Sequence, residues 1–539
     1  MMGKAALTGF ERLLALFTRI RPGEGRSLAL FFLQGFLLLF SYYVVRALRE
    51  AFILTEFSAV VRSYAVAAIA LVLMALIPLY SLLRRRLGGE RLVQVIIAFF
   101  ALNLLAFCLF GLAGQRFGFA FYVWVGLFGV MLVAQFWAFT TDTFNLKSGQ
   151  RLFPLIMIGA NLGALAGAQF ARLAVGWLGT YGLMLAATVV LAAALLLSAP
   201  ARRAAPDASR SLATNDVPPK SWTGGFSIVL GDRYLLLIAL FVVLLNWINT
   251  TGGFVLAGVV QERALQLAAG PQAVEPARYI TEFYGNFMSW VTAAGFAIQA
   301  LLVARMYRIL GLGAVLLIPP LLAVFSYGLM AFVPIFSIIQ IVKILEDSVN
   351  YSLGNTNRQA LFLPTSPSAK YDGKTTIETF FWRFGDLIQA GAVYVGVNLL
   401  AWGTTQFAAL NLVLALVWLG LAVAIGREYR RQALINVINV PPELARPLAD
   451  FHFAPGRPFH YSIPEDAFVD ADPGDVLALS ARRRDGGTLP AWVAFDPSSG
   501  TFSGRPPMDC EEALLIEVVA TDVDGTAARG FFAMRRTIG

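Results

Sequence analysis

Long apolar runs recur along most of this chain, and each is near the 20 residues that a helix needs to cross about 30 Å of hydrocarbon. Hydrophobic residues make up 58% of the 539 residues and charged residues only 14%, whereas a soluble protein has about 25% charged residues. We therefore predict an all-α polytopic membrane protein followed by a polar tail. Twelve spans are predicted, at residues 27–54, 61–83, 92–115, 119–143, 153–174, 176–198, 234–258, 281–304, 311–334, 335–354, 378–402 and 406–426.

Basic residues indicate how these spans are oriented, because cytoplasmic loops are enriched in Lys and Arg. With the N-terminus inside, basic clusters such as 84–86 and 427–431 fall on the inner side. The predicted outer loops hold only Arg62, Arg116, Arg172, Arg263 and Arg278. The net charge of +9 therefore reflects membrane topology, and we expect no nucleic-acid partner. Both ends of the membrane domain are predicted to face the cytoplasm, and we expect no cleaved signal peptide.

A polar segment rich in Pro, Ala and Ser, residues 199–233, divides the spans into six and six. We predict a basic cytoplasmic N-terminus (1–26), a first six-helix bundle (27–198), a central cytoplasmic loop (199–233) and a second six-helix bundle (234–431). Transporters of the major-facilitator type have this 6+6 arrangement, and transporter substrate sites lie near the bilayer midplane between repeats. We therefore expect a major-facilitator-like fold.

Three charges, Arg46, Arg49 and Glu50, end the first apolar run in "SYYVVRALREAFIL". One interpretation ends the helix near Val45 and lets both arginines reach the outer interface. The other continues the helix to Leu54 and turns the charges toward a cavity. Charges inside a membrane are costly and usually face a cavity, so we favour the second interpretation.

Further polar residues interrupt the later spans. Lys343 and Asp347 are four residues apart, with Glu346 on an adjoining helix face, and Arg383 lies three residues before Asp386. Asn246 and Asn249 are one turn apart in "NWINTTGGF". The alternative for each group is a structural role, through internal ion pairing or hydrogen bonds between helices.

Two glycine-containing motifs are not taken as ligand sites. "GANLGALAG" places Gly159, Gly163 and Gly167 at four-residue spacing, which predicts close helix packing. "SAKYDGKTT" ends like a phosphate-binding loop but has Ser368 where that loop needs glycine. His452 and His460 have no nucleophile or metal set around them. We therefore expect no enzyme activity, and transport driven by a gradient or by exchange.

Several cations in a membrane cavity suit an anionic substrate, because Arg and Lys pair with phosphate or carboxylate groups. The carboxylates suit proton coupling or a salt-bridge switch between inward and outward states. Predicted substrate-binding residues are Arg46, Arg49, Asn246, Asn249, Arg358, Lys374 and Arg383. Predicted coupling or gating residues are Glu50, Lys343, Glu346, Asp347 and Asp386.

Residues 20–430 resemble the ATP:ADP antiporter family, most clearly in "VVRALREAF", "NWINTTGGF" and "YSLGNTNRQALFLPTSPSAKYDGKTTIETFFWRFGD". The resemblance implies twelve helices, a bacterial inner membrane and a nucleotide substrate such as ATP or ADP, whose phosphates bind basic residues within helices. Arg49 and Arg358 stand where family members tend to carry Lys. The chain departs from the family at Gly253, where an acid is expected, at Asp386, where many carriers have Lys, and near 125–126, where an expected acid is not evident. A related phosphorylated anion is therefore an open alternative.

The tail after Arg431 changes character. Residues 432–454 are predicted as a linker, and residues 455–539 alternate apolar and polar residues between turn signals. "LPAWVAFD" and "GTFSG" resemble a dystroglycan-type cadherin-like, Ig-like β-sandwich with Trp492 as core aromatic. The resemblance implies either a protein partner or Ca²⁺, whose preferred ligands are oxygens; the alternative is turns that bind no metal. The candidate calcium ligands are Asp470, Asp472, Asp475, Asp522 and Asp524.

Two other functions remain open from the sequence. One is a proton-coupled facilitator of a different solute. The other is a membrane anchor that transports nothing and presents the β-sandwich to a protein partner. Apart from Ca²⁺ in the tail, no cofactor is expected.

Overall fold

The computed structural model describes residues 20–21, 24–87, 89–144, 146–204, 222–271, 273–365, 369–438, 441–470, 476–522 and 525–537. The chain divides into two compact units, Met1–Tyr429 and Arg430–Gly539. We call them the helical unit and the β unit, and describe each by itself.

Long helices form the first half of the helical unit: α2 (Glu24–Glu56), α3 (Ala59–Leu87), α4 (Gly89–Leu112), α5 (Gly118–Thr143) and α6 (Leu146–Arg203). At 1.5 Å per residue, the 58 residues of α6 would extend about 87 Å, far more than a bilayer. Gly179 breaks this helix with φ 68° and ψ 177°, a conformation that only glycine adopts without strain. Two helices are therefore present here, as predicted, but the break at Gly179 lies inside the predicted span 176–198 and not at its boundary with 153–174.

Shorter elements and π-helical turns make up the second half. The helices are α7 (Trp222–Gly231), α8 (Arg233–Ala268), α9 (Pro276–Ile298), α10 (Ala304–Val315), α11 (Ile318–Phe332), α12 (Phe336–Val349), α13 (Asn355–Ala360), α14 (Lys374–Thr376), α15 (Trp382–Tyr394) and α16 (Thr404–Ile438). The π-helical turns are η1 (Gln299–Val303), η2 (Asn350–Gly354), η3 (Ala369–Gly373), η4 (Ile377–Phe381) and η5 (Val395–Leu399). Helix α7 and the end of α6 lie inside the predicted central loop 199–233, so part of this segment is helical. The apolar stretch "FSIVLG" favours a helix there.

Within the described residues, eight helical segments are long and apolar enough to cross a membrane, and α11 is a shorter apolar helix. Two of the eight, Arg151–Arg203 with 53 residues and Pro276–Val315 with 40 residues, are long enough for two spans of about 20 residues each. They contain non-helical glycines, Gly179 and Gly311. The count of twelve spans therefore stays a prediction.

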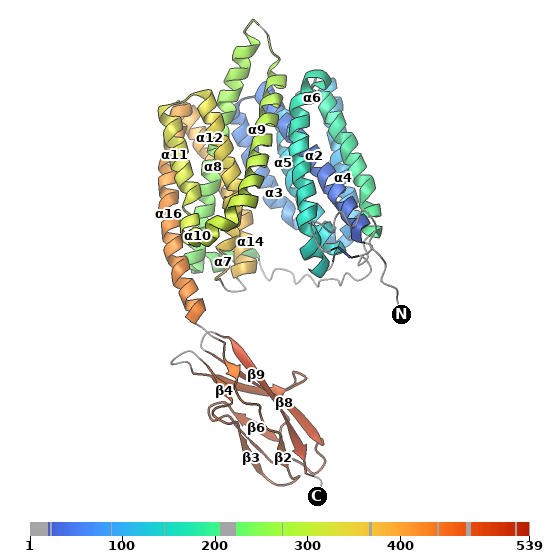
Figure 1. Ribbon diagram of the computed structural model, residues 1–539, viewed down its shortest axis with the longest axis vertical. Coiled ribbons are helices and arrows are strands. Elements are labelled where there is room, and N and C mark those ends of the chain that lie inside the picture. The colour runs from blue at the N-terminus through green and yellow to red at the C-terminus, as the bar shows by residue number, and fades with distance from the viewer. Residues whose placement is uncertain are drawn as a thin grey trace. The chain divides into compact units, whose positions relative to one another are not determined.

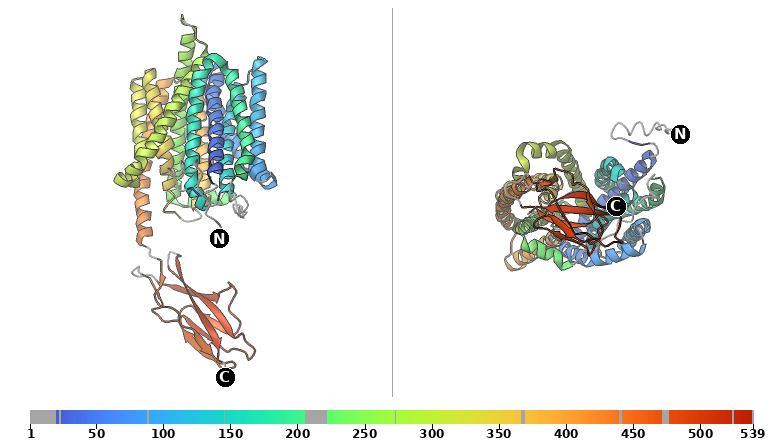
Figure 2. Two further views of the ribbon diagram at one scale, coloured as in Figure 1. Left: turned by 45° about the vertical axis from the view of Figure 1, so that its right-hand side comes forward. Right: turned by 90° about the horizontal axis from the view of Figure 1, so that it is seen from below.

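The long helices run side by side along one common direction (Figure 2). Helices α2, α4, α5 and α6 gather on one side of the unit, and α10, α11, α12 and α16 on the other (Figure 1). Helices α2 and α6 touch along their backbones: a Cβ on Gly163 would lie 2.1 Å from Phe36 O, and one on Gly167 2.2 Å from Phe40 O. The predicted close packing at these glycines is confirmed.

The β unit contains two larger sheets and one two-stranded sheet, which share one apolar core. The strands are β1 (Glu443–Leu444), β2 (Phe451–Phe453), β3 (Phe459–Ser462), β4 (Phe468–Val469), β5 (Ala478–Arg483), β6 (Val493–Asp496), β7 (Thr501–Gly504), β8 (Ala513–Thr521) and β9 (Ala527–Arg536). The sheet orders are β2-β9-β8-β5 and β3-β7-β6, with β1 and β4 paired at the side. Phe502 and Phe532 are buried between the sheets, 5.4 Å apart by ring centroids.

Two predictions for this unit need correction. Residues 432–454 are not a linker throughout, because α16 continues to Ile438 and both β1 and β2 lie in this range. Strand β2 pairs in parallel with β9, with Phe451 opposite Met534, so the sandwich begins before residue 455. Trp492 is only partly buried and packs at the margin of the core against Phe453, 5.5 Å away.

Candidate functional site

One cavity of about 190 Å³ lies between the two halves of the helical unit. Helices α2, α3 and α5 line it from the first half, and α8, α9, α12 and η2 line it from the second. Its charged side chains are four cations and two carboxylates: Arg46, Arg49, Arg62, Lys343, Glu50 and Asp347. Tyr43, Tyr122, Tyr284 and Tyr351 contribute aromatic rings with hydroxyl groups.

Helix α2 contains the first apolar run together with the charged residues that follow it. The helix continues unbroken to Glu56, and Arg46, Arg49 and Glu50 line the cavity. Arg46 donates from Nη2 to the Tyr351 hydroxyl over 2.9 Å, and its guanidinium lies 5.4 Å from the Tyr43 ring centroid. The structure therefore agrees with the second interpretation, in which the helix continues to Leu54 and the charged residues face a cavity.

Glu50 is the shared acceptor of this part of the cavity. Its side chain is only 2% exposed and accepts from Arg62 Nε over 2.6 Å and from Arg49 Nε over 3.3 Å. The Tyr122 hydroxyl also donates to Glu50 over 3.3 Å, while Arg49 lies 4.6 Å from the Tyr122 ring centroid. A buried carboxylate needs such partners, and these fix the orientation of both arginines.

Arg62 is the charged residue of the cavity that is missing from the predicted site residues, and the four tyrosines of the lining are missing as well. It was assigned to an outer loop, but α3 already begins at Ala59, and Arg62 is buried on its first turn. The signal was present, because residues 59–61 before it are apolar and continue the run into the span. A charge inside an apolar run is a candidate site residue.

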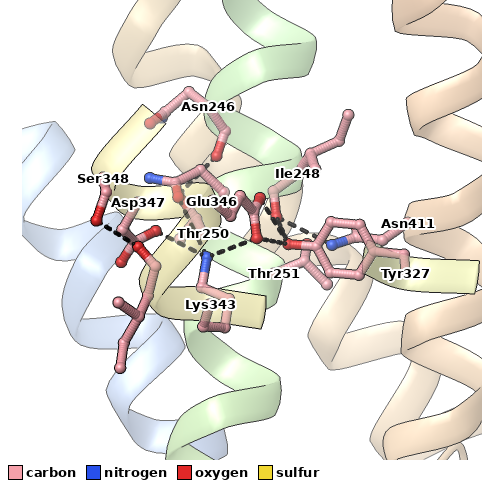
Figure 3. A network of polar contacts seen from close by, with 12 residues as sticks. Asn246, Ile248, Thr250, Thr251, Tyr327, Lys343, Glu346, Asp347, Ser348 and Asn411 are labelled. Atoms are coloured by element: carbon pink, nitrogen blue, oxygen red, sulfur yellow. Dashed lines mark hydrogen bonds and ion pairs between the residues drawn. The ribbon is translucent and has the colours of Figure 1, made fainter. Parts of the chain in front are cut away.

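Lys343 is the centre of the second polar group (Figure 3). Its ammonium lies 3.0 Å from Glu346 Oε2 and 2.9 Å from Asp347 Oδ1, and the side chain is 1% exposed. The Tyr327 hydroxyl donates to Glu346 over 2.9 Å. Asp347 faces the cavity, whereas Glu346 lies behind Lys343 and does not line it. Asn249, a predicted substrate ligand, lines the cavity and accepts from Lys343 over 3.4 Å.

Three predicted site residues lie outside the cavity, between α8 and α15. Asn246 donates to Trp382 O over 2.8 Å and to Asp386 Oδ1 over 2.7 Å. Asp386 also accepts from Arg383 Nη1 over 3.4 Å. This is the hydrogen bonding between helices that the sequence left open as an alternative for Asn246.

Two further predicted phosphate ligands lie together, away from the cavity. Arg358 stacks on Trp382, with 4.2 Å between the guanidinium carbon and the ring centroid, and donates to Asn355 Oδ1 over 3.1 Å. Lys374 donates to Gln359 Oε1. Neither residue lines the central cavity.

Comparison with known proteins supports the transporter interpretation of this fold. The chain superposes on the peptide transporter POT in complex with sulfate with a TM-score of 0.53 and 16% identity, over 77% of this chain and 98% of that one. A variant of the nucleoside transporter NupG gives 0.51 and 13%, over 75% and 99%. A bacterial homolog of the human lysosomal transporter Spinster, inward-facing and unoccupied, gives 0.51 and 12%, over 77% and 99%. Fold and site therefore define a class: a multi-pass membrane protein with a major-facilitator-like transporter fold, as predicted.

Sequence comparison adds a more particular likeness. Over 374 residues the chain is 24% identical to ADP,ATP carrier protein 1 of Chlamydia pneumoniae, covering 61% of this chain and 70% of the carrier. The predicted resemblance to the ATP:ADP antiporter family is thereby confirmed. Residues 441–537 match the family described as putative Ig domain, so the predicted Ig-like tail is also confirmed.

The calcium prediction concerns the turns of the β unit. Asp472, Asp475 and Asp524 lie outside the described residues. Asp522 accepts from Thr526 N over 2.7 Å and from the Thr526 hydroxyl, which closes the turn before β9. Among the described residues, no group of three or more His, Cys, Asp or Glu side chains could hold a metal ion. Calcium binding through Asp470 and its neighbours stays a prediction.

Proposed function

We propose that this chain carries a nucleotide, or a related phosphorylated anion, across a bacterial inner membrane by alternating access of its two halves. The observation that carries the proposal is the convergence of Arg46, Arg49, Arg62 and Lys343 on one cavity lined by both halves. A phosphate group accepts several charge-assisted hydrogen bonds at once, which suits guanidinium groups in particular.

The balance of charge supports an anionic substrate. Four cations face the cavity against two carboxylates, Glu50 and Asp347, and Glu346 stands behind Lys343. Excess positive charge in a low-dielectric site is costly without a counter-charge. A phosphorylated solute would provide that counter-charge while bound.

Residues at the boundary of the halves suit a transport cycle. Arg46 of α2 reaches Tyr351 of η2, so one hydrogen bond of the cavity wall joins the first half to the second. A substrate phosphate that replaces Tyr351 as the partner of Arg46 would release this connection, and substrate binding would then be coupled to movement of the halves.

Uptake of ATP labelled at the α-phosphate tests the proposal in cells expressing the chain. We expect uptake that unlabelled ADP competes away and that Arg49→Ala reduces at least ten-fold. Arg263→Ala is the matched control, because Arg263 is an exposed arginine outside the cavity. No uptake above cells with empty vector, with the protein verified in the membrane, would refute nucleotide transport.

Proton-coupled transport of another solute is the second candidate, favoured by the placement of Lys343 between two carboxylates. One ammonium neutralises only one carboxylate fully, so the second is available for a proton during the cycle. An uncoupler of the proton gradient would stop such transport, whereas exchange of one anion for another would be largely insensitive.

The β unit is proposed to lie in the cytoplasm and to bind a protein partner or Ca²⁺. Removing residues 441–539 separates this role from transport. Uptake is expected to survive the truncation. A chain that serves only as an anchor for the β unit would show no uptake with or without it.

A further inference from the structure

Gly253 of α8 leaves an open space in the cavity beside the guanidinium of Arg62. A Cβ placed on Gly253 would lie 3.6 Å from Arg62 Nη2 and 3.7 Å from Nη1, with no other atom of the described chain within 4 Å. Glycine inside a helix weakens the helix relative to alanine. Its presence here keeps the wall of the cavity open beside the guanidinium.

Arg62 has a hydrogen-bond donor near Gly253 that Glu50 does not use. Its Nε and Nη2 donate to Glu50, whereas Nη1 has no acceptor in the part of the chain that the structure describes. Guanidinium groups offer five donors in a fixed plane. Nη1 is therefore a donor that faces Gly253 while the rest of the group is held in place by Glu50.

Tyr284 provides an independent sign of a ligand in the same cavity. Its ring is buried, only 4% exposed, and its hydroxyl has no hydrogen-bond partner among the described residues. A buried hydroxyl without a partner carries a free-energy cost that a bound ligand removes. Tyr284 lies on α9 and lines the cavity together with Arg62 and Gly253.

We infer that an anionic oxygen of the transported solute, from a phosphoryl or carboxylate group, binds between Arg62 and Tyr284 in the space that Gly253 leaves open. The inference rests on the proposed function and adds a position for one acidic group of the substrate. Arg62 belongs to the first half and Tyr284 to the second, so the bound oxygen bridges both halves.

Thermal unfolding of the purified full-length chain with added pyrophosphate tests this site, because a ligand that binds the folded state raises its stability. We expect Gly253→Asp to reduce the apparent pyrophosphate affinity at least ten-fold, since its carboxylate would pair with Arg62. Tyr284→Phe is expected to reduce it several-fold through loss of the hydroxyl donor. Gly258→Ala is the matched control, because a Cβ at this other glycine of α8 meets no atom within 4 Å.

Each outcome decides the inference. Equal affinity of pyrophosphate for Gly253→Asp, Tyr284→Phe and the unaltered chain overturns it and leaves nucleotide transport standing. Loss of affinity in the variants, together with absent ATP uptake in cells, supports the site and refutes the nucleotide as substrate. No stabilisation of the unaltered chain by pyrophosphate, ADP or ATP overturns both. If Gly253→Asp does not fold, the affinities of Gly253→Ala and Tyr284→Phe for pyrophosphate test the site instead. The methyl group of Gly253→Ala would lie at contact distance from Arg62 and would fill part of the open space.

Discussion

Arg62 Nε lies 2.6 Å from Oε2 of Glu50, and this ion pair joins α3 to α2 at the wall of the cavity. Both side chains are nearly buried, with 11% and 2% exposed. The pair fixes Glu50, and Glu50 in turn holds Arg49 at 3.3 Å. The geometry of three charged groups thus depends on one arginine at the start of α3.

Arg62→Ala is expected to reduce substrate uptake at least ten-fold per folded molecule. Removing one partner of a buried ion pair costs about 3–5 kcal/mol, and we expect the lower end because Arg49 still pairs with Glu50. Uptake and thermal unfolding, each normalised to membrane protein, measure the two effects. Arg263→Ala, at another arginine of a predicted outer loop, should change neither; normal uptake by Arg62→Ala would contradict a role for this arginine.

The sequence predicts most of the helical unit because the apolar runs are governed by one physical requirement, the thickness of the hydrocarbon. It also predicts that Arg46, Arg49, Asn249, Lys343 and Asp347 share a site, since charges in apolar runs have few other places to go. What it cannot predict is the face of each helix. Asn246 lies only three residues before Asn249, yet it binds Asp386 between helices while Asn249 lines the cavity.

The ends of helices and strands are mispredicted for a different reason. Residue 62 lies at the predicted start of a span, where a basic residue is equally compatible with a loop and with a helix. Phe451 and Phe453 stand in a Pro-containing segment that looks like a linker, and only the pairing of β2 with β9, about 80 residues later in the chain, makes it a strand. Such long-range pairing leaves no local signal.

Gly163→Ala tests the contact between α2 and α6. The added Cβ would lie 2.1 Å from Phe36 O, so the helices must separate, and overpacking of this kind costs about 1–3 kcal/mol. Thermal unfolding in detergent should show a lower midpoint. Gly391→Ala in α15 is the control, because a Cβ there meets nothing within 4 Å; an equal midpoint for both variants would contradict the close packing.

Lys343→Ala tests the buried polar group of α12. The substitution leaves Glu346 and Asp347 without their shared cation, and one unpaired buried charge costs about 3–5 kcal/mol. We expect a lower yield of folded protein and a lower unfolding midpoint, partly restored by the second change Asp347→Asn. Lys374→Ala removes a lysine outside the cavity and should leave the midpoint unchanged. A stable Lys343→Ala protein without the second change would show that the carboxylates find other partners.

Glu517 makes the β unit sensitive to acid. Arg482 donates to it over 2.6 Å and Arg529 over 3.2 Å, and these bonds hold the pKa of the Glu517 carboxyl below its ordinary value of 4.5. A carboxyl with a lowered folded pKa stabilises the fold above pH 4.5 and loses this contribution as the pH falls through the folded value. Hydrogen exchange of the β8 amides, corrected for intrinsic rates, should therefore accelerate below pH 4.5.

Glu517→Gln should flatten this acid response, because the amide does not titrate. Glu465→Gln, at an exposed glutamate of the same unit, should leave it unchanged. An equally steep acceleration in Glu517→Gln would assign the acid sensitivity to other carboxyls, such as Asp450, whose pKa is lowered by hydrogen bonds from Ala533 N and Arg535.

Gln261 of α8 joins the two halves by hydrogen bonds at one end of the helical unit. Its amide donates to Leu54 O over 2.7 Å and to Phe57 O over 2.8 Å, and accepts from Ala59 N over 3.2 Å. These backbone groups lie at the end of α2 and the start of α3, where helices leave donors and acceptors unpaired. One side chain from the second half thus satisfies three groups of the first.

Gln261→Ala is expected to open this end of the unit more often, because the closed arrangement loses three hydrogen bonds of about 0.5–1.5 kcal/mol each. Leu256→Cys, at a buried position of the cavity, reports the opening when Cys108 and Cys510 are replaced by serine. A membrane-impermeant maleimide added from the predicted outer side should label this cysteine faster in Gln261→Ala. Gln266→Ala is the control, because among the described residues Gln266 bonds within its own helix, to Glu262 and Arg263. Equal labelling rates in the two variants would mean that Gln261 does not hold the halves together.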